Sequence, residues 1–227
     1  MGLREMVGEN AEQFAAYYKL LVEWNKKINL TAITEEADVY AKHFMDSLAV
    51  VLSGKIKDGQ RVVDIGTGAG FPGLVLAIHN PSLSVVLLDS LNKRVTFLNE
   101  VIEALELKNV TAVHGRAEDF AKQPDFRERF DAAVSRAVAA LPSLLELCLP
   151  FVKVGGFFIA QKGPAAYAEA DAAKNAVSTL GGQLESIFPY QIPDADLDHN
   201  LVLVKKIAQT STKYPRKSPK PIKDPLK

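Results

Sequence analysis

Residues 62–73 are the part of this chain best suited to bind a polar ligand. Their letters are VVDIGTGAGFPG, so an apolar strand ends in Asp64 and leads into alternating glycines: Gly66, Gly68 and Gly70. Glycine has no Cβ atom, so a turn built from it brings backbone N–H groups close to a ligand. The apolar run 74–78 predicts a helix, whose first turn offers further unpaired N–H groups. This strand, turn and helix predict a nucleotide-cofactor site.

Two cofactors fit the glycine-rich turn. Gly68, Gly70 and Gly73 match the dinucleotide pattern G-x-G-x-x-G. Asp64 followed by alternating glycines is instead typical of methyltransferases that use S-adenosylmethionine (SAM), where the acid holds the amino-acid part of the cofactor. A phosphate would be repelled by Asp64, because like charges repel. The turn therefore favours SAM over a dinucleotide.

A second acid lies at the expected distance from the first. Asp89 ends the apolar strand 84–88, where an acid commonly binds the ribose hydroxyls of an adenosine cofactor. An acid is expected at this position for either cofactor, a dinucleotide or SAM. Asp89 could also cap the helix expected over residues 92–105. A third strand over 109–113 leads into residues 115–119, a turn expected to lie against the adenine.

The elements that position these residues alternate between strand and helix. The expected strands are 61–65, 84–88, 109–113, 130–134, 156–161, 184–188 and 200–206. Helical runs between the first five imply βαβ units and a parallel sheet. The last two strands are separated only by the loop expected at 189–199, which favours a hairpin and an antiparallel seventh strand. These features predict an α/β, Rossmann-like class I SAM-dependent methyltransferase fold with a seven-stranded, mostly parallel sheet.

The chain divides into three zones: an N-terminal helical extension (1–53), a SAM-binding methyltransferase domain (54–207) and a basic, proline-rich tail (208–227). Within the first zone a stripe at helical spacing predicts a buried face: Phe14, Tyr17, Tyr18, Leu21 and Trp24. The 227 residues include one cysteine, which excludes an internal disulfide and fits a reducing compartment. No run of about 18 apolar residues and no signal peptide is evident, so we expect a cytoplasmic protein, monomeric and unattached to membranes.

The tail carries a net positive charge that the rest of the chain balances. Residues 205–227 hold seven Lys and one Arg against one Asp, a charge of 8 − 1 = +7, so the remainder carries −7. Four prolines favour an extended arm rather than a helix. We expect the arm to contact RNA phosphates, and not the cofactor, through Lys213, Arg216, Lys217, Lys220 and Lys223. The alternatives are a solvated, disordered terminus and an arm that docks on the acidic body to balance its charge.

The methyl acceptor is expected near residues 131–137, after the fourth strand. The sequence lacks the Asn/Asp-Pro-Pro-aromatic loop that is usual in adenine amino methylation. Cys148 lies on an apolar helix face, which favours a buried thiol over a nucleophile for pyrimidine carbon-5 methylation. The histidines are scattered, so we expect no metal site and assign no catalytic residue. Guanine N7 suits this sequence, because its lone pair is free and transfer needs mainly proximity.

Seven motifs, in order along nearly the whole chain, support a more specific identification. They are WNKKINLT (24–31), HFMDSL (43–48), DIGTGAGFPG (64–73), DSLNKR (89–94), GRAE (115–118), VSRA (134–137) and YPRK (214–217). In these motifs the chain resembles the bacterial small-subunit rRNA guanine-N7 methyltransferase family, RsmG or GidB. The resemblance implies that one guanine of 16S rRNA, free or in the small subunit, is the target. It also implies SAM contacts from Gly66, Phe71, Asp89, Ser90, Leu91, Ala117, Glu118 and Arg136.

Some motif residues keep two interpretations. Arg136 suits a substrate phosphate or the cofactor carboxylate, and it would equally suit a surface ion pair. The motifs at 24–31 and 43–48 fit RNA contact or helix packing and capping equally well. Three other functions remain open: a nicotinamide-dependent reductase, which needs neither Asp64 nor a basic arm; a small-molecule methyltransferase, which needs no arm; and a non-catalytic SAM-binding or RNA-binding module.

Overall fold

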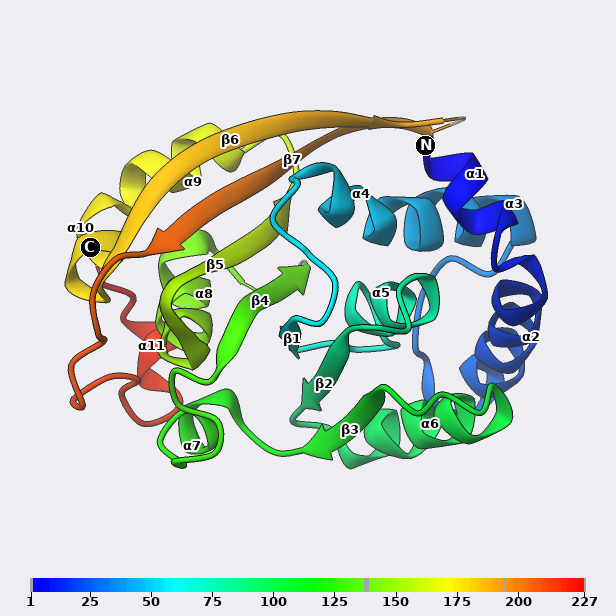
Figure 1. The fold of residues 1–227 in the computed structure, drawn as a ribbon, viewed down its shortest axis with the longest axis horizontal. Coiled ribbons are helices and arrows are strands. Elements are labelled where there is room, and N and C mark those ends of the chain that lie inside the picture. Colours follow the sequence, from blue (N-terminus) through cyan, green and yellow to red (C-terminus); the bar gives the residue numbers. More distant parts are fainter. Residues whose placement is uncertain (1, 137–138, 194, 227) are drawn as a thin grey trace.

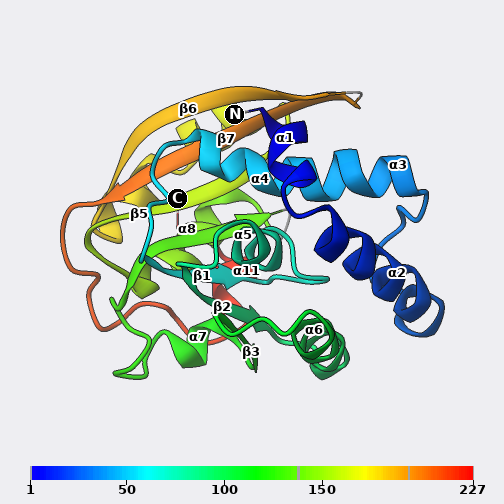
Figure 2. The same cartoon turned by 45° about the vertical axis from the view of Figure 1, so that its right-hand side comes forward.

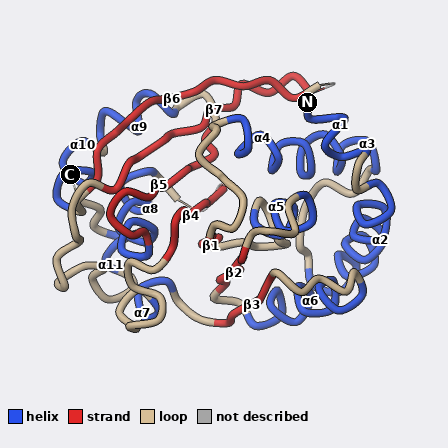
Figure 3. The backbone as a smooth tube through the Cα atoms, viewed as in Figure 1, coloured by secondary structure: helices blue, strands red, loops and turns tan. Residues whose placement is uncertain are grey.

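The computed structural model describes residues 2–136, 139–193 and 195–226. The chain folds as a central sheet covered by helices on both faces (Figures 1 and 3). The strands are β1 (Arg61–Ile65), β2 (Ser84–Asp89), β3 (Val110–His114), β4 (Phe130–Arg136), β5 (Val152–Lys162), β6 (Gly182–Ile192) and β7 (Ala195–Lys206). The helices are α1 (Leu3–Gly8), α2 (Ala11–Ile28), α3 (Glu36–Val39), the π-helical η1 (Tyr40–Met45), α4 (Asp46–Leu52), α5 (Gly73–His79), α6 (Asn92–Ala104), α7 (Ala117–Phe120), α8 (Leu141–Cys148), the 3-10 turn η2 (Leu149–Phe151), α9 (Ala166–Ala172), α10 (Lys174–Thr179) and α11 (Lys220–Lys223).

The sheet has the strand order β3-β2-β1-β4-β5-β7-β6. Its first five strands pair in parallel, and β7 runs antiparallel to both β5 and β6. This confirms the predicted class I methyltransferase fold, including its reversed last strand. The prediction of a loop over residues 189–199 is wrong, because β6 continues to Ile192 and β7 starts at Ala195. Pro189 is tolerated in β6 because that strand is the edge of the sheet, where a missing N–H costs no ladder bond.

Each face of the sheet has its own apolar core, because successive residues of a strand point to opposite sides. In β1, Val62 belongs to the cluster under the N-terminal helices, α5 and α6, whereas Val63 belongs to the cluster under α8, α9 and α10. Figure 2 shows the first group of helices on one side of the strands. The carboxyl ends of the parallel strands are left between these layers, which is where an open α/β sheet binds ligands.

The N-terminal helices share a core with the sheet. Phe14, Tyr17 and Leu21 of α2 are fully buried in the same cluster as Val62, as the helical stripe predicts. Tyr18 and Trp24 are half-buried. The zone boundary predicted near residue 53 falls in the connection between α4 and β1, and it remains a prediction. No helix within the described residues is long and apolar enough to cross a membrane.

The basic arm is docked on the body, contrary to the expectation of a wholly extended segment. Arg127 donates to the carbonyl oxygens of Thr210 and Tyr214 at 2.6 and 3.0 Å, which fixes the start of the arm. Arg216 pairs with Glu146 of α8 at 2.6 Å. Residues 220–223 form the one-turn helix α11, so the prediction of a non-helical arm is wrong there. The interpretation of docking on the acidic body is the one that this geometry favours.

Candidate functional site

The glycine-rich turn between β1 and α5 is braced from below by Asp64. This carboxylate is fully buried, and its Oδ2 accepts hydrogen bonds from Thr67 Oγ1 and Gly73 N, both at 2.7 Å. A Cβ at position 73 would lie 2.6 Å from the Cβ of Asp64, so only glycine fits there. Burial raises the pKa of Asp64 to about 7, against the opposing effect of the two hydrogen bonds. The structure shows Asp64 holding the turn through Oδ2, while its buried Oδ1 has no hydrogen-bond partner, and the predicted contact of Asp64 with the cofactor stays a prediction.

The turn is also supported by the N-terminal helices. Tyr17 of α2 donates a hydrogen bond from its hydroxyl to the carbonyl oxygen of Ala69. Gly70 has φ +103°, and a Cβ there would lie 2.5 Å from the Tyr17 oxygen. Gly70 therefore packs against α2 rather than facing a ligand. Sequence reasoning placed Tyr17 in the core but could not foresee this contact, because the two residues are far apart in the chain.

A cavity of about 460 Å³ lies above the turn, and we call it the loop cavity. Asp89 closes one side: its Oδ2 accepts from Gly68 N and its Oδ1 from Leu91 N, both at 2.9 Å. Asp89 thus connects the turn after β1 with the turn after β2. The lining of the loop cavity includes seven of the predicted cofactor residues: Gly66, Gly68, Phe71, Asp89, Ser90, Leu91 and Arg136.

A second cavity, of about 290 Å³, adjoins the loop cavity and is called the α8 cavity here. The two share Gly66 and Ser90. Ala117 and Glu118 line the α8 cavity, as expected for the turn after the third strand. Nine of the eleven predicted cofactor residues therefore line one cavity or the other, while Asp64 and Gly70 line neither.

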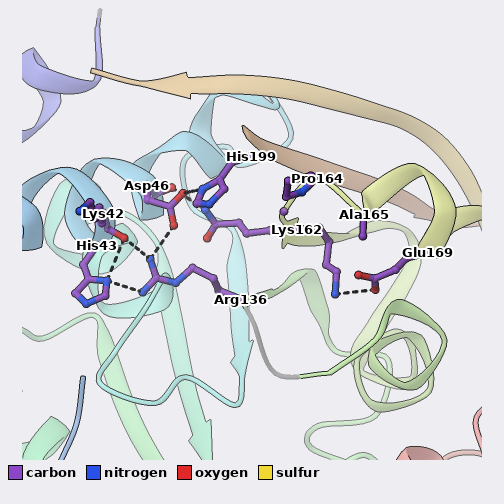
Figure 4. A pocket seen from close by; sticks show the side chains of 11 residues that line it. Lys42, His43, Asp46, Arg136, Lys162, Pro164, Ala165, Glu169 and His199 are labelled. Atoms are coloured by element: carbon purple, nitrogen blue, oxygen red, sulfur yellow. Dashed lines mark hydrogen bonds and ion pairs between the residues drawn. The ribbon is translucent and has the colours of Figure 1, made fainter. Parts of the chain in front are cut away.

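A third cavity, of about 430 Å³, lies on the other side of the loop cavity, towards the β6–β7 hairpin. We call it the hairpin cavity (Figure 4). His43 and Arg136 line both it and the loop cavity, so the two spaces meet at these side chains. Lys162 and Glu169 form an ion pair of 2.8 Å at the opposite side of the hairpin cavity. The three cavities form a row along the carboxyl ends of the strands.

Arg136 is the central group between the loop and hairpin cavities. Its Nη1 donates to Asp46 Oδ2 at 2.8 Å and to the Lys42 carbonyl at 3.2 Å, and its Nη2 contacts His43 Nδ1 at 3.2 Å (Figure 4). The guanidinium also lies 4.8 Å from the ring centre of Phe71, within the range of a cation–π contact. A guanidinium has five N–H donors, so three contacts leave two for a ligand.

The sequence model of the GidB family, described as rRNA small subunit methyltransferase G, matches residues 10–197. The chain belongs to the GidB family. It is 54% identical over 215 residues to ribosomal RNA small subunit methyltransferase G of Lachnoclostridium phytofermentans, covering 95% of this chain and 89% of that protein. The protein of the same name from Clostridium botulinum strain Alaska E43 is 52% identical over 223 residues, with 98% and 93% covered.

A solved structure agrees in fold. TrmN from Thermus thermophilus superposes with a TM-score of 0.56 at 18% identity, covering 72% of this chain and 49% of that one. GidB proteins are SAM-dependent rRNA methyltransferases, and the residues of this chain fit that cofactor. Gly66 and Gly68 line the loop cavity and have no side chains to fill it, and Asp89 supplies a carboxylate to the same lining. Among the described residues no group of three or more His, Cys, Asp or Glu is placed to hold a metal ion.

His43 of this GidB chain is held neutral. Burial, together with the nearby charge of Arg136, lowers its pKa to about 4. Nδ1 of His43 lies 3.2 Å from Arg136 Nη2 and 3.0 Å from the Lys42 carbonyl oxygen, and its Nε2 lies 2.8 Å from Thr31 Oγ1. The backbone N–H of Thr31 in turn donates a hydrogen bond to Asn25 Oδ1 at 2.9 Å. The motifs at 24–31 and 43–48 are thereby connected to Arg136, which sequence patterns alone could not show.

Asp46 anchors the other side of Arg136. Its Oδ1 accepts from Tyr190 Oη and His199 Nδ1, both at 2.7 Å. Burial raises the pKa of Asp46, but the hydrogen bond from His199 and the charge of Arg136 outweigh it, so the pKa lies below its usual value. Tyr190 and His199 come from the β6–β7 hairpin and were not predicted as site residues. The π-helical turn η1 carries His43 into this cluster, and such turns recur at functional sites.

The arm residues predicted to bind RNA separate into two groups. Arg216 is committed to Glu146 and is only 18% exposed. The other four are exposed and form no ion pair with a described residue: Lys213, Lys217, Lys220 and Lys223. Ala137 of the motif at 134–137 lies outside the described residues, whereas Arg136 of that motif is well placed between the cavities.

Proposed function

We propose that this GidB protein methylates N7 of one guanine of 16S rRNA by direct transfer from SAM, without an essential general base. The observation that carries the proposal is the row of three cavities, in which the loop cavity meets the hairpin cavity at Arg136 and His43 and adjoins the α8 cavity at Gly66 and Ser90. In this arrangement the α8 and loop cavities take the adenosine and amino-acid parts of SAM, and the hairpin cavity takes the base. The names of the relatives support an rRNA substrate of the small subunit.

Three titratable groups that line the hairpin cavity are already engaged with donors or partners: His43, Asp46 and Glu169. His43 has a pKa of about 4 and is held by Arg136 and Thr31. Both oxygens of Asp46 accept hydrogen bonds from charged or hydroxyl donors. Glu169 accepts from the backbone N–H of Leu141 at 2.7 Å as well as from Lys162. N7 of guanine needs no deprotonation, so a site without a free base suits it.

SAM supplies an electrophilic methyl group that needs no activation by the protein. The residues of this chain therefore act by position, since holding two reactants together removes most of the entropic barrier. Arg136 has two N–H groups left for the cofactor carboxylate or an RNA phosphate. Its hydrogen bond to Asp46 fixes the orientation of the planar guanidinium. Phe71 and Leu91 contribute apolar surface that displaces water from the loop cavity.

The RNA partner is supported by charge. Residues 205–227 carry +7 on a body of −7, and five of their described lysines are exposed: Lys205, Lys213, Lys217, Lys220 and Lys223. Their positive charge offers phosphate contacts beside a surface that otherwise repels a polyanion. We place the protein in the cytoplasm as a monomer, where ribosomal RNA is accessible as free 16S rRNA or as the small subunit.

The test is to incubate the protein with SAM bearing a labelled methyl group and small subunits or 16S rRNA from cells that lack the enzyme. The label is expected at a single guanine, whose glycosidic bond becomes labile after borohydride reduction because N7 is methylated. Heat-denatured protein serves as the control. Label on a guanine exocyclic nitrogen, N1 or another base would contradict the N7 assignment, and no transfer at all would favour a binding module.

A further inference from the structure

The C-terminal arm reaches the cofactor side of the molecule. Ile222 of α11 lines the α8 cavity together with Leu147 of α8 and Ala117 of α7. Its side chain is 46% exposed. Pro221, its neighbour, is buried. Ile222 therefore has apolar surface available at the cavity that adjoins Gly66 and Ser90.

The position of Ile222 is fixed by an ion pair. Arg216 Nη2 donates to Glu146 Oε2 at 2.6 Å and to the Asp224 carbonyl at 2.8 Å. Glu146 is fully buried in α8 and directly precedes Leu147 on the opposite cavity wall. Arg216 thus ties the chain before and after Ile222 to the helix that carries Leu147. Charge-assisted contacts of this kind are stronger and shorter than neutral ones.

We propose that Ile222 is a cofactor-binding residue that forms the outer wall of the adenine subsite, with Arg216 as the residue that positions it. This inference rests on the proposed placement of the SAM adenine in the α8 cavity. A flat, largely apolar ring in that cavity covers the exposed face of Ile222, and burial of such surface is favourable. The arm therefore serves SAM as well as RNA, which revises the expectation that it contacts RNA alone.

The arm then couples the two ligands. Ile222 lines the α8 cavity and Arg216 pairs with Glu146, while Lys220 and Lys223 of the same short helix are exposed. A ligand that holds α11 in place from one side favours binding on the other, and such coupling is reciprocal. SAM is expected to tighten RNA binding through this one-turn helix.

The experiment measures SAM and 5′-methylthioadenosine affinities by calorimetry on the full chain and three variants. In Ile222→Ser, both affinities should fall by about the same factor, roughly 3- to 10-fold, because both ligands carry the adenine. Ile207→Ser is the matched control, since Ile207 is 51% exposed and lines none of the three cavities. Ala117→Leu fills the α8 cavity from its other side. Both isoleucines are exposed, so thermal unfolding should confirm intact folds.

The outcomes separate the inference from the placement on which it rests. Weaker binding in Ile222→Ser and Ala117→Leu, with Ile207→Ser unchanged, supports both. Normal binding in Ile222→Ser with weaker binding in Ala117→Leu overturns the role of Ile222 and leaves the adenine in the α8 cavity. Normal binding in both variants places the adenine elsewhere and overturns the two together.

Discussion

The guanidinium of Arg136 and the carboxylate of Asp46 lie 2.8 Å apart, although 90 residues separate them in the chain. Arg136 ends β4 and Asp46 begins α4, so their ion pair joins the sheet to the N-terminal helices at the boundary of two cavities. Asp46 is almost fully buried and Arg136 is largely buried. Water screens such a pair little, which makes it both a structural contact and the element that orients the Arg136 fork.

Arg136→Gln should therefore affect both stability and binding. Removing the cation leaves Asp46 with only Tyr190 and His199, and breaking a buried pair from one side costs about 3 kcal/mol. SAM affinity should fall as well, because the free N–H groups of Arg136 are lost. Urea unfolding and calorimetry measure the two effects. The double variant Arg136→Gln with Asp46→Asn should lose less stability than the sum of the singles; strict additivity would show that the pair is not coupled.

Direct transfer predicts a flat pH dependence for the chemical step. His43 has a pKa of about 4, so it stays neutral from pH 5 to 9 and contributes no inflection. His199→Asn should keep the single-turnover rate at saturating substrate within a few-fold, whereas loss of a general base costs on the order of 100-fold or more. A rate that rises steeply through pH 7 and disappears in His199→Asn would make His199 the base and remove N7 as the favoured acceptor.

Asp64 gives a prediction on stability, because its folded pKa of about 7 exceeds the usual value of 3.8. The folded state keeps the proton over this range while the unfolded state has lost it, so the contribution of Asp64 to stability falls as pH rises from 4 to 7. Asp64→Asn removes this dependence. Between pH 5 and 8 the free energy of unfolding of the wild type should drop relative to the variant by on the order of 2–3 kcal/mol.

The same variant tests the role assigned to Asp64 by the structure. Its carboxylate braces the turn through Thr67 and Gly73 rather than lining the loop cavity. An asparagine oxygen can still accept both hydrogen bonds, so SAM affinity should change by less than about tenfold. Asp89→Asn, at a residue that lines the cavity, is the comparison and should lose more. A larger loss in Asp64→Asn than in Asp89→Asn would restore the contact with the cofactor that the sequence predicts.

Local sequence patterns predicted the features that depend on neighbouring residues. The strand-turn-helix around Gly66–Gly70, the acid at Asp89 and the parallel strands all follow from spacing and hydrophobicity. The contacts of Asp46 with Tyr190 and His199 could not be predicted from such patterns, because they join segments more than 140 residues apart. The docking of the arm was expected only as an alternative, since its prolines and charges favour extension and only the buried Glu146 shows where Arg216 binds.

The last prediction concerns the four exposed lysines of the arm. Replacing Lys213, Lys217, Lys220 and Lys223 with alanine should weaken rRNA binding and flatten the slope of log K against log salt by about three units, since each neutralised phosphate contributes roughly 0.7–0.9. Thermal stability should not change, because none of the four forms an ion pair with a described residue. Alanine at four exposed body lysines is the control, and these are Lys19, Lys57, Lys108 and Lys122. Filter binding at several salt concentrations decides the matter. Equal slopes for the arm variant and the wild type would show that the arm only balances the charge of the body, whereas equal slopes for the control and the wild type would confine the RNA contacts to the arm.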